Sequence, residues 1–150
     1  MIPPLNVECF TCTQEANDQL PQRERVWRVP GWRVAHSFNS SLPGWVVVVP
    51  TRHVESFEEL STEEASVLGE LLRDLTVALK SVTGCQKTYV ILLAEAEGFT
   101  HMHFHVVPRM ENLPSDRRGT GIFAYLKEEP LTSHERDQIA GRISAALSSL

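Results

Sequence analysis

The chain has 150 residues, 42% of them hydrophobic, and a formal net charge of −5 at pH 7. This length is enough for one domain with a hydrophobic core, and because no Gly/Ser linker or charge block divides the chain, we expect a single domain over residues 1–150. The negative charge disfavours binding to polymeric DNA or RNA, which needs a broad cationic surface. No apolar run is long enough to span a bilayer, and no signal-peptide pattern follows Met1, so we expect a cytoplasmic protein.

Five strands are expected along the chain. Short β-type runs at 26–29 and 33–38 flank the turn pair Pro30-Gly31 and predict a hairpin. The continuous apolar run 45–49 lies between two prolines and is typical of a strand buried on both faces, so we expect it to be central. Further strands are predicted over 88–94 and 103–108.

Two helices are expected from capping and leucine spacing. The first begins at Ser61, carries leucines at helical intervals and ends at Gly84, and the second is capped by Thr132 with Glu135 near the C-terminus. The segment 112–120, which contains Pro, Asp, two Arg and Gly, is expected to be a mobile loop. The sequence therefore predicts an α+β fold, an antiparallel sheet of about five strands with a long central helix and a C-terminal helix.

Three of the chain's six histidines, His101, His103 and His105, alternate with apolar residues. In a strand this period places the three rings on one face and turns Met102, Phe104 and Val106 into the core. Imidazole acts at neutral pH as nucleophile, proton carrier or metal ligand, so the cluster predicts a chemical site. The alternative is a set of histidines that each satisfy a local hydrogen bond.

The run 101–109, His-Met-His-Phe-His-Val-Val-Pro-Arg, resembles the signature of the histidine triad (HIT) family of nucleotide hydrolases and transferases. The stretch 38–54, in which an aliphatic strand runs into Pro-Thr-Arg-His, is similar to a second block of that family. With the helix between them, the two blocks cover roughly residues 9–110, and together they are more specific than either alone. The resemblance implies a HIT-like fold, a small nucleotide substrate and a homodimer.

The resemblance also implies roles for the two later histidines. His103 would attack an α-phosphate and carry a covalent nucleotidyl intermediate, from which water takes the nucleotide. His105 would donate to a phosphate oxygen or help to protonate the leaving group, the alternative being a ring packed beside the site.

Three further residues are candidate substrate contacts. Asn39 matches the position at which the family presents an acidic or amide side chain to the ribose hydroxyls, although the segment is also good turn chemistry. Thr100 precedes the triad and is a candidate donor to the phosphate. Arg109 follows the triad, where it would contact a phosphate or pair with a carboxylate.

Cys9 and Cys12 form a C-x-x-C pair, which outside a disulfide framework is a redox pair or half of a metal site. Bacterial-type family members with an N-terminal C-x-x-C, and the related galactose-1-phosphate uridylyltransferases, bind zinc through this pair, a histidine from a separate segment and the first triad histidine. The matching residues here are Cys9, Cys12, His53 and His101, a set suited to structural zinc. The alternatives are two inert thiols, a His53 that simply ends a strand and a His101 that belongs to the phosphate site.

The chain departs from the common family pattern at two places. Trp45 stands where many members carry a histidine, and only its indole N–H is available for hydrogen bonding. Glu95 and Glu97 stand before the triad where many members have neutral donors, and we expect these carboxylates to face solvent, since a phosphate would repel them.

Three functions follow from these features. The first is a nucleotide hydrolase or nucleotidyl transferase that cleaves a phosphoanhydride or phosphoramidate bond at the α-phosphate, for example in a dinucleoside polyphosphate or a nucleoside phosphoramidate. The second is a nucleotide-binding or regulatory module with little turnover. The third, a thiol redox protein, is weaker because no thioredoxin-like βαβ pattern follows Cys12.

Overall fold

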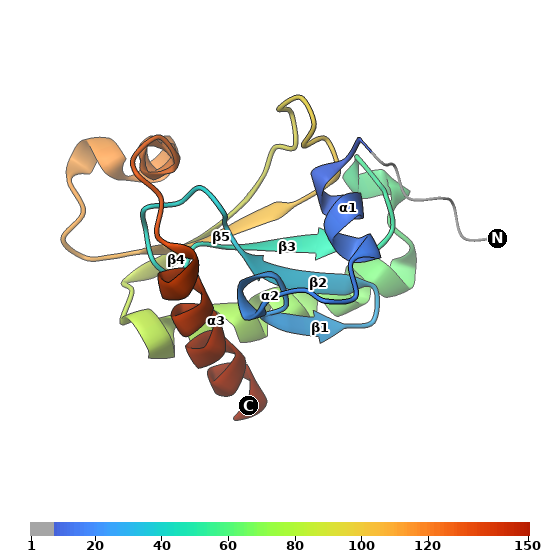
Figure 1. The fold of residues 1–150 in the computed structure, drawn as a ribbon. Helices are drawn as coiled ribbons and strands as arrows, with labels where there is room; N and C mark the ends of the chain where they lie inside the picture. The colour runs from blue at the N-terminus through green and yellow to red at the C-terminus, as the bar shows by residue number, and fades with distance from the viewer. Residues whose placement is uncertain (1–7) are drawn as a thin grey trace.

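A five-stranded antiparallel sheet forms the centre of the molecule. The structure, a computed structural model, describes residues 8–150, so residues 1–7, where the sequence shows no signal-peptide pattern, lie outside the described part. The strands follow the spatial order β1-β2-β3-β5-β4 (Figure 1). They are β1 (Trp27–Val29), β2 (Trp32–His36), β3 (Val46–Pro50), β4 (Lys87–Leu92) and β5 (Phe104–Arg109). The predicted α+β fold is confirmed.

The middle strand of this sheet is β3, as the run of valines predicts. It pairs with β2 on one side and β5 on the other, and the register places Val47 opposite both Ala35 and His105. The hairpin between β1 and β2 turns at Gly31, whose φ of +86° favours glycine. The predicted and observed strand boundaries agree within about two residues, which is the usual uncertainty at element ends.

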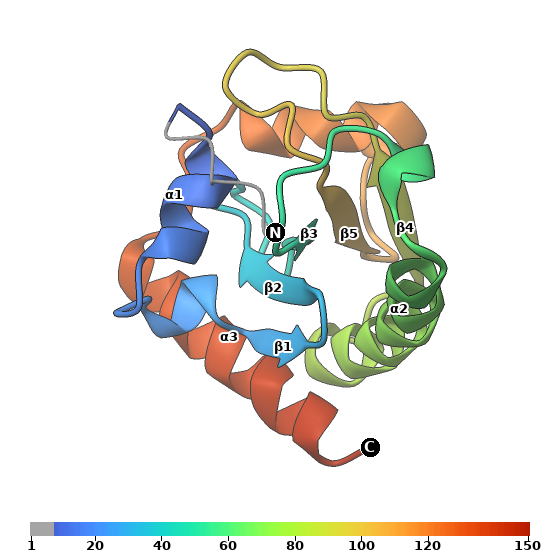
Figure 2. The same ribbon diagram turned by 90° about the vertical axis from the view of Figure 1, so that its right-hand side faces the viewer.

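Two long helices cover one face of the sheet (Figure 2). Helix α2 (Thr62–Thr83) begins with a capping box between Ser61 and Glu64 and ends at Gly84, which has a left-handed φ of +72°. Helix α3 (Ser133–Ser148) begins with the same reciprocal hydrogen bonds between Thr132 and Glu135. Both helices therefore begin where the sequence signals place them. Within residues 8–150, no helix is long and apolar enough to cross a membrane.

Strand β5 separates two apolar clusters on opposite faces of the sheet. Met102, Phe104 and Val106 join the large core under α2 and α3, as the alternation predicts. On the other face, Val107 packs with Trp45 and Ile122 in a smaller cluster. His103 and His105 share this second face, so the chemistry is turned away from the two long helices.

Two segments differ from the sequence expectations. The predicted mobile loop over 112–120 instead holds a 3₁₀ helix, Ser115–Arg117, and the start of a longer one, η4 (Gly119–Leu126), which packs over the second face. Arg118 orders this segment by donating to the carbonyl oxygens of Leu113 and Glu111. Helix α1 (Phe10–Ala16) was not predicted, because its threonines and cysteine are weak helix formers and tertiary contacts hold it.

Candidate metal centre and active site

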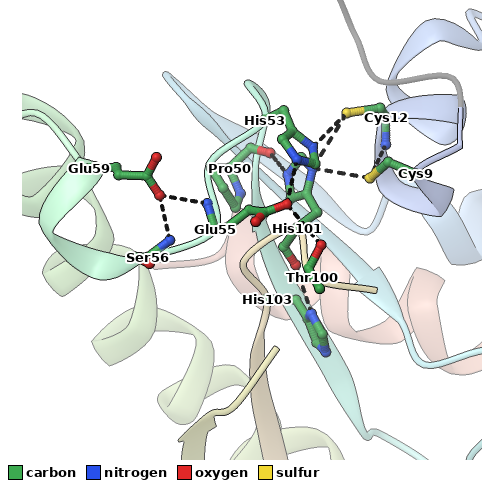
Figure 3. Close-up of polar contacts among 10 residues, drawn as sticks. All are labelled: Cys9, Cys12, Pro50, His53, Glu55, Ser56, Glu59, Thr100, His101 and His103. Atoms are coloured by element: carbon green, nitrogen blue, oxygen red, sulfur yellow. Dashed lines mark hydrogen bonds and ion pairs between the residues drawn. The ribbon is translucent and has the colours of Figure 1, made fainter. Parts of the chain in front are cut away.

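Two thiols and two imidazoles from three separate segments converge at the N-terminal end of β5 (Figure 3). Cys9 caps helix α1 and Cys12 lies in its first turn, whereas His53 follows β3 and His101 precedes β5. Their four ligand atoms all lie within 4.8 Å of one another. The cluster could therefore hold one metal ion, and the structure brings together all four residues that the sequence analysis selected.

In both imidazoles, the hydrogen bond made by Nε2 determines that Nδ1 is the nitrogen that faces the cluster. Nε2 of His101 lies 2.9 Å from the Pro50 carbonyl oxygen and Nε2 of His53 lies 3.0 Å from a Glu55 carboxylate oxygen. Because both partners only accept, each Nε2 carries the proton and each Nδ1 presents a lone pair. These two Nδ1 atoms are only 3.2 Å apart. Two facing lone pairs repel each other unless a cation lies between them, so the geometry fits a shared metal ion.

Burial keeps the His101 ring in the form that binds a metal. The side chain is 1% exposed, and burial lowers its pKa to about 4. Glu55 supports the neighbouring ligand in ionised form, because hydrogen bonds first from Thr100 and then from His53 lower the pKa of its carboxyl. His101 thus has Nδ1 at the cluster and Nε2 on the Pro50 carbonyl oxygen, which favours the metal interpretation of this residue over the phosphate interpretation.

His103 points away from the cluster (Figure 3) and has a defined orientation. Its Nδ1 lies 3.0 Å from the carbonyl oxygen of His101. A carbonyl only accepts, so Nδ1 carries the proton and Nε2 presents a lone pair. This is the form in which an imidazole acts as a nucleophile.

His105 is held by an aromatic enclosure on the same face. The indole Nε1 of Trp45 donates to its Nδ1 at 3.0 Å, and the ring meets Phe123 edge-on at a centroid distance of 5.4 Å. Burial, and secondly the charge of His103, lower the pKa of His105 to about 4. His105 is therefore neutral at physiological pH, with its proton on Nε2.

A cavity of about 290 Å³ lies against these two histidines. That volume is close to the lower limit of small-molecule sites, which hold roughly 300–1,000 Å³. One wall is an aromatic group, which we call the phenylalanine triplet: Phe10, Phe38 and Phe99, with ring centroids 5.1–5.8 Å apart. The base of the cavity comes from three neighbouring strands and the residue before β5: Arg33, Ala35, Val47, Val49, His103 and His105.

Arg33 is the only cationic side chain among the described residues that line this cavity. It is 2% exposed and its guanidinium is occupied by an ion pair with Glu15, by the Glu24 carbonyl oxygen at 2.6 Å and by the Glu24 carboxylate at 3.4 Å. Burial is the largest influence on Glu24 and raises its pKa. These contacts of Arg33 attach two segments to β2: helix α1, which contains Glu15, and the following turn, which contains Glu24.

Of the three remaining predicted site residues, one lines the cavity and two do not. Asn39 lines the cavity, and its Oδ1 accepts from the Ser37 hydroxyl at 2.9 Å. Thr100 donates to Glu55 at 2.8 Å and so belongs to the surroundings of the metal cluster. Arg109 lies at the opposite end of β5, about 20 Å along the strand from His103 at the usual rise per residue. Neither Thr100 nor Arg109 lines the cavity.

The acidic residues before the triad take the expected position. Glu95 and Glu97 are exposed, and neither lines the cavity, whereas Ala96 and Phe99 of the same loop do. Cys85 is also buried but lies outside the cluster.

Sequence reasoning missed several residues of this site. Glu55 was detectable, because a carboxylate two residues after a ligand histidine is well placed to orient it. Arg33 was also detectable as a charged residue between Trp32 and Val34 in a predicted strand. His36 gave no such signal: its Nδ1 donates to the Ser37 carbonyl oxygen at 2.9 Å, and its Nε2 accepts from the Gly44 backbone at 3.0 Å.

The sequence also matches a known family. The family model for the HIT domain matches residues 22–112, which include His53 and the whole triad. The chain belongs to the HIT domain family. HIT membership associates it with nucleotide binding and nucleotide chemistry. A comparison with curated protein sequences found no match.

Solved HIT structures share the fold at low sequence identity. A hypothetical histidine triad nucleotide-binding protein from Sulfolobus tokodaii aligns with a TM-score of 0.72 at 13% identity, over 95% of this chain and 93% of that one. A zinc-bound histidine triad family protein from Mycobacterium smegmatis gives 0.69 at 15% identity, over 94% of each chain. A HIT-like protein from Bartonella henselae, described as involved in cell-cycle regulation, gives 0.65 at 19% identity, over 86% and 89%. These likenesses establish the HIT fold for this chain.

Proposed function

We propose that this HIT protein is a nucleotide hydrolase or nucleotidyl transferase in which His103 attacks the α-phosphate. The observation that carries the proposal is the contact between His103 Nδ1 and the His101 carbonyl oxygen at 3.0 Å. This contact leaves the Nε2 lone pair available on a residue that lines the cavity. A nucleophile oriented through its other ring nitrogen is what covalent catalysis by imidazole requires.

The reaction has two displacements at phosphorus. In the first, Nε2 of His103 forms a bond to the α-phosphorus, and the bond to the leaving group breaks with its electron pair. In the second, the oxygen of water or another acceptor forms a bond to the same phosphorus, the phosphorus–nitrogen bond breaks with its electron pair returning to Nε2 of His103, and the proton of the acceptor passes to solvent. Suitable substrates are phosphoanhydrides, such as dinucleoside polyphosphates, and nucleoside phosphoramidates.

The rest of the cavity offers complementary contacts to a nucleotide. The phenylalanine triplet provides apolar aromatic surface for a planar base. Because the Asn39 Oδ1 already accepts from Ser37, its amide N–H groups remain as donors for ribose oxygens. The Nε2–H of His105 provides a donor toward the phosphate.

We also propose that the metal of the cluster is zinc and that its role is structural. Tetrahedral zinc, with Zn–S near 2.3 Å and Zn–N near 2.0 Å, places S and N atoms about 3.5 Å apart and two N atoms about 3.3 Å apart. Three of the four Sγ–Nδ1 separations are 3.3–3.5 Å, and Nδ1 of His53 and Nδ1 of His101 are 3.2 Å apart. Four protein ligands would close the coordination sphere, so the zinc would hold α1 against the sheet and leave the displacement to His103.

A second candidate function, a nucleotide-binding or regulatory module with little turnover, has one observation in its favour. Among the described cavity residues, only Arg33 is cationic, and its guanidinium is already engaged by Glu15 and Glu24. Phosphate binding would then depend on neutral donors, which stabilise developing charge less than a guanidinium does.

The two candidates separate in one experiment. Purified protein is incubated with a panel of dinucleoside polyphosphates and nucleoside phosphoramidates that differ in base, and release of nucleoside monophosphate is followed, with binding measured in parallel by calorimetry. We expect release above the rate of the His103→Asn variant for at least one substrate. Binding without release for the whole panel would establish the regulatory module.

Two expectations concern the architecture of the working protein. We propose that residues 1–150 act as a single domain and that two copies form a homodimer, as the resemblance to the HIT family implies. Light scattering that gives the mass of one chain at micromolar concentration would contradict the dimer, and two separate unfolding transitions would contradict the single domain.

A further inference from the structure

Trp45 and His105 form a hydrogen bond whose direction is fixed by chemistry. The indole nitrogen can only donate, and it lies 3.0 Å from Nδ1 of His105. Trp45 is fully buried, and its ring also packs against Phe123, so it has no freedom to turn away. Nδ1 of His105 must therefore accept, and the proton of the neutral ring lies on Nε2.

This bond also opposes the charged form of His105. An imidazolium carries protons on both nitrogens, and the proton on Nδ1 would point at the indole N–H. The aromatic enclosure around His105 leaves no carboxylate within its described contacts to compensate a positive charge. His105 can thus offer a hydrogen bond from Nε2, but it cannot release that proton as an acid, because a neutral imidazole is far too weak an acid.

We infer that Trp45 is a positioning residue that makes His105 a hydrogen-bond donor without acid function, and that the chain therefore prefers phosphoanhydride over phosphoramidate substrates. This inference rests on the function proposed above and specifies its substrate class. A phosphate leaving group departs as a stable anion, whereas an amine must be protonated before or during departure.

The two substrate classes differ in the first displacement, in whether the leaving atom needs a proton. His103 Nε2 forms the new bond to phosphorus in both cases, and the leaving atom takes the electron pair of the broken bond. With a phosphoanhydride, the bridging oxygen keeps that pair as a phosphate anion and needs no proton from the protein. With a phosphoramidate, the bridging nitrogen would leave as an amide anion unless a proton reaches it, and a donor must then be found.

The other titratable side chains that line the cavity are not placed to supply that proton. His36 uses both ring nitrogens in hydrogen bonds to the backbone, as Nδ1 donates to Ser37 and Nε2 accepts from Gly44. Glu24 is engaged by Arg33. Arg33 lies on β2, two strands away from β5, which is about 10 Å at the usual strand spacing.

Trp32 provides a matched control for Trp45. It is also fully buried, and its indole also donates one hydrogen bond, to the Glu64 carbonyl oxygen at 3.0 Å. It lies in the core under α2 and α3 and does not line the cavity. Trp45→Phe and Trp32→Phe therefore remove the same group and similar volume, but only the first changes the partner of His105.

The first arm of the test reads the His105 ring directly and needs no substrate. Nitrogen NMR of the metal-loaded protein with labelled histidine distinguishes the protonated from the unprotonated ring nitrogen. We expect His105 to be neutral with its proton on Nε2, and we expect a mixed or charged ring in Trp45→Phe but not in Trp32→Phe. A proton on Nδ1 of His105 in the unmodified protein would overturn the inference, even if Trp45→Phe failed to fold.

The second arm compares single-turnover rates for a phosphoanhydride and a phosphoramidate of the same nucleoside. General acid catalysis contributes typically 10²–10⁴-fold, so we expect the unmodified protein to cleave the anhydride at least about a hundredfold faster. Trp45→Phe should narrow this ratio at least about tenfold, while Trp32→Phe should leave it within about twofold. Equal rates in the unmodified protein would overturn the preference while leaving the proposed function intact. If both substrates bind and neither is cleaved, the proposed function fails and the preference fails with it.

Discussion

His101 and His105 lie on either side of His103, yet their second nitrogens meet opposite partners. At His101 the Pro50 carbonyl accepts from Nε2, which leaves the Nδ1 lone pair for the thiol cluster. At His105 the Trp45 indole donates to Nδ1, which leaves a proton on Nε2. Burial lowers the pKa of both rings to about 4, so charge does not distinguish them. The group that faces the second nitrogen decides whether a buried imidazole is a ligand or a donor.

The largest effect is expected at the residue between these two histidines. His103→Asn keeps a polar side chain but removes the nucleophilic nitrogen, so turnover should fall at least about a thousandfold while nucleotide binding stays within about threefold. Single-turnover kinetics and calorimetry measure the two quantities. His134→Asn, at an exposed histidine of α3, is the control and should leave both unchanged. A rate for His103→Asn within about tenfold of the unmodified protein would exclude covalent catalysis by this residue.

Removal of the metal ion tests the interpretation of His101 as a metal ligand. Cys12→Ser should abolish stoichiometric zinc and lower the free energy of unfolding by at least about 3 kcal/mol, because binding at a structural site contributes to folding. In a chain of this length that corresponds to roughly 10 °C in Tm. Cys85→Ser changes a cysteine that is also buried but lies outside the cluster, so its zinc content should be unchanged. Elemental analysis measures the zinc content, and calorimetry measures Tm. If the unmodified protein contains no zinc and its Tm does not change when a chelator is added, the proposed metal site is wrong.

His36 extends the comparison to an imidazole whose two nitrogens are both occupied. Burial lowers the pKa of His36 to about 4. The unfolded chain therefore takes up this proton first, near pH 6.5, so the contribution of His36 to stability is fully present above pH 6.5 and is lost as pH falls toward 4. The loss amounts to about 3 kcal/mol.

Urea unfolding at a series of pH values measures the contribution of His36. His36→Gln, which keeps an acceptor near Gly44 but does not titrate, should show a correspondingly shallower decline between pH 6.5 and 4. Parallel curves for the two proteins would mean that His36 is not the group responsible.

The smallest effect is expected in the loop between β4 and β5. Glu95 and Glu97 are exposed and do not line the cavity. Glu95→Gln and Glu97→Gln should each change kcat/KM by less than about threefold, as screened surface charges do. A much larger change, above all one that removed a dependence on Mg²⁺, would assign the loop to the phosphate site.

The sequence predicted those features that depend on local patterns. The alternation correctly placed Met102, Phe104 and Val106 in the core, and the capping boxes at Ser61 and Thr132 gave the correct helix starts. Such signals act over a few residues and need no knowledge of packing. The four metal-site residues were selected through the family resemblance, since nothing in the chain itself says that residues 9 and 101 meet.

What the sequence did not predict depends on tertiary contacts. Arg109 is adjacent to the triad in the chain, but an extended strand carries it away from the cavity. Helix α1 forms although its residues favour it weakly, because Glu15 pairs with Arg33 and Cys9 and Cys12 face the cluster. The sequence shows that Trp45 offers one N–H, but its acceptor, Nδ1 of His105, lies 60 residues further along the chain and comes within reach through the pairing of β3 with β5.

The most direct measurement is the mass of the protein during turnover. A phosphoanhydride substrate is mixed with the protein, the reaction is stopped within milliseconds in alkaline denaturant, which preserves a phosphorus–nitrogen bond, and the intact mass is recorded. We expect a transient species heavier by one nucleotidyl group, with the modification located on His103 and absent from His103→Asn. Turnover that proceeds with the protein unmodified at every time point would contradict the covalent mechanism.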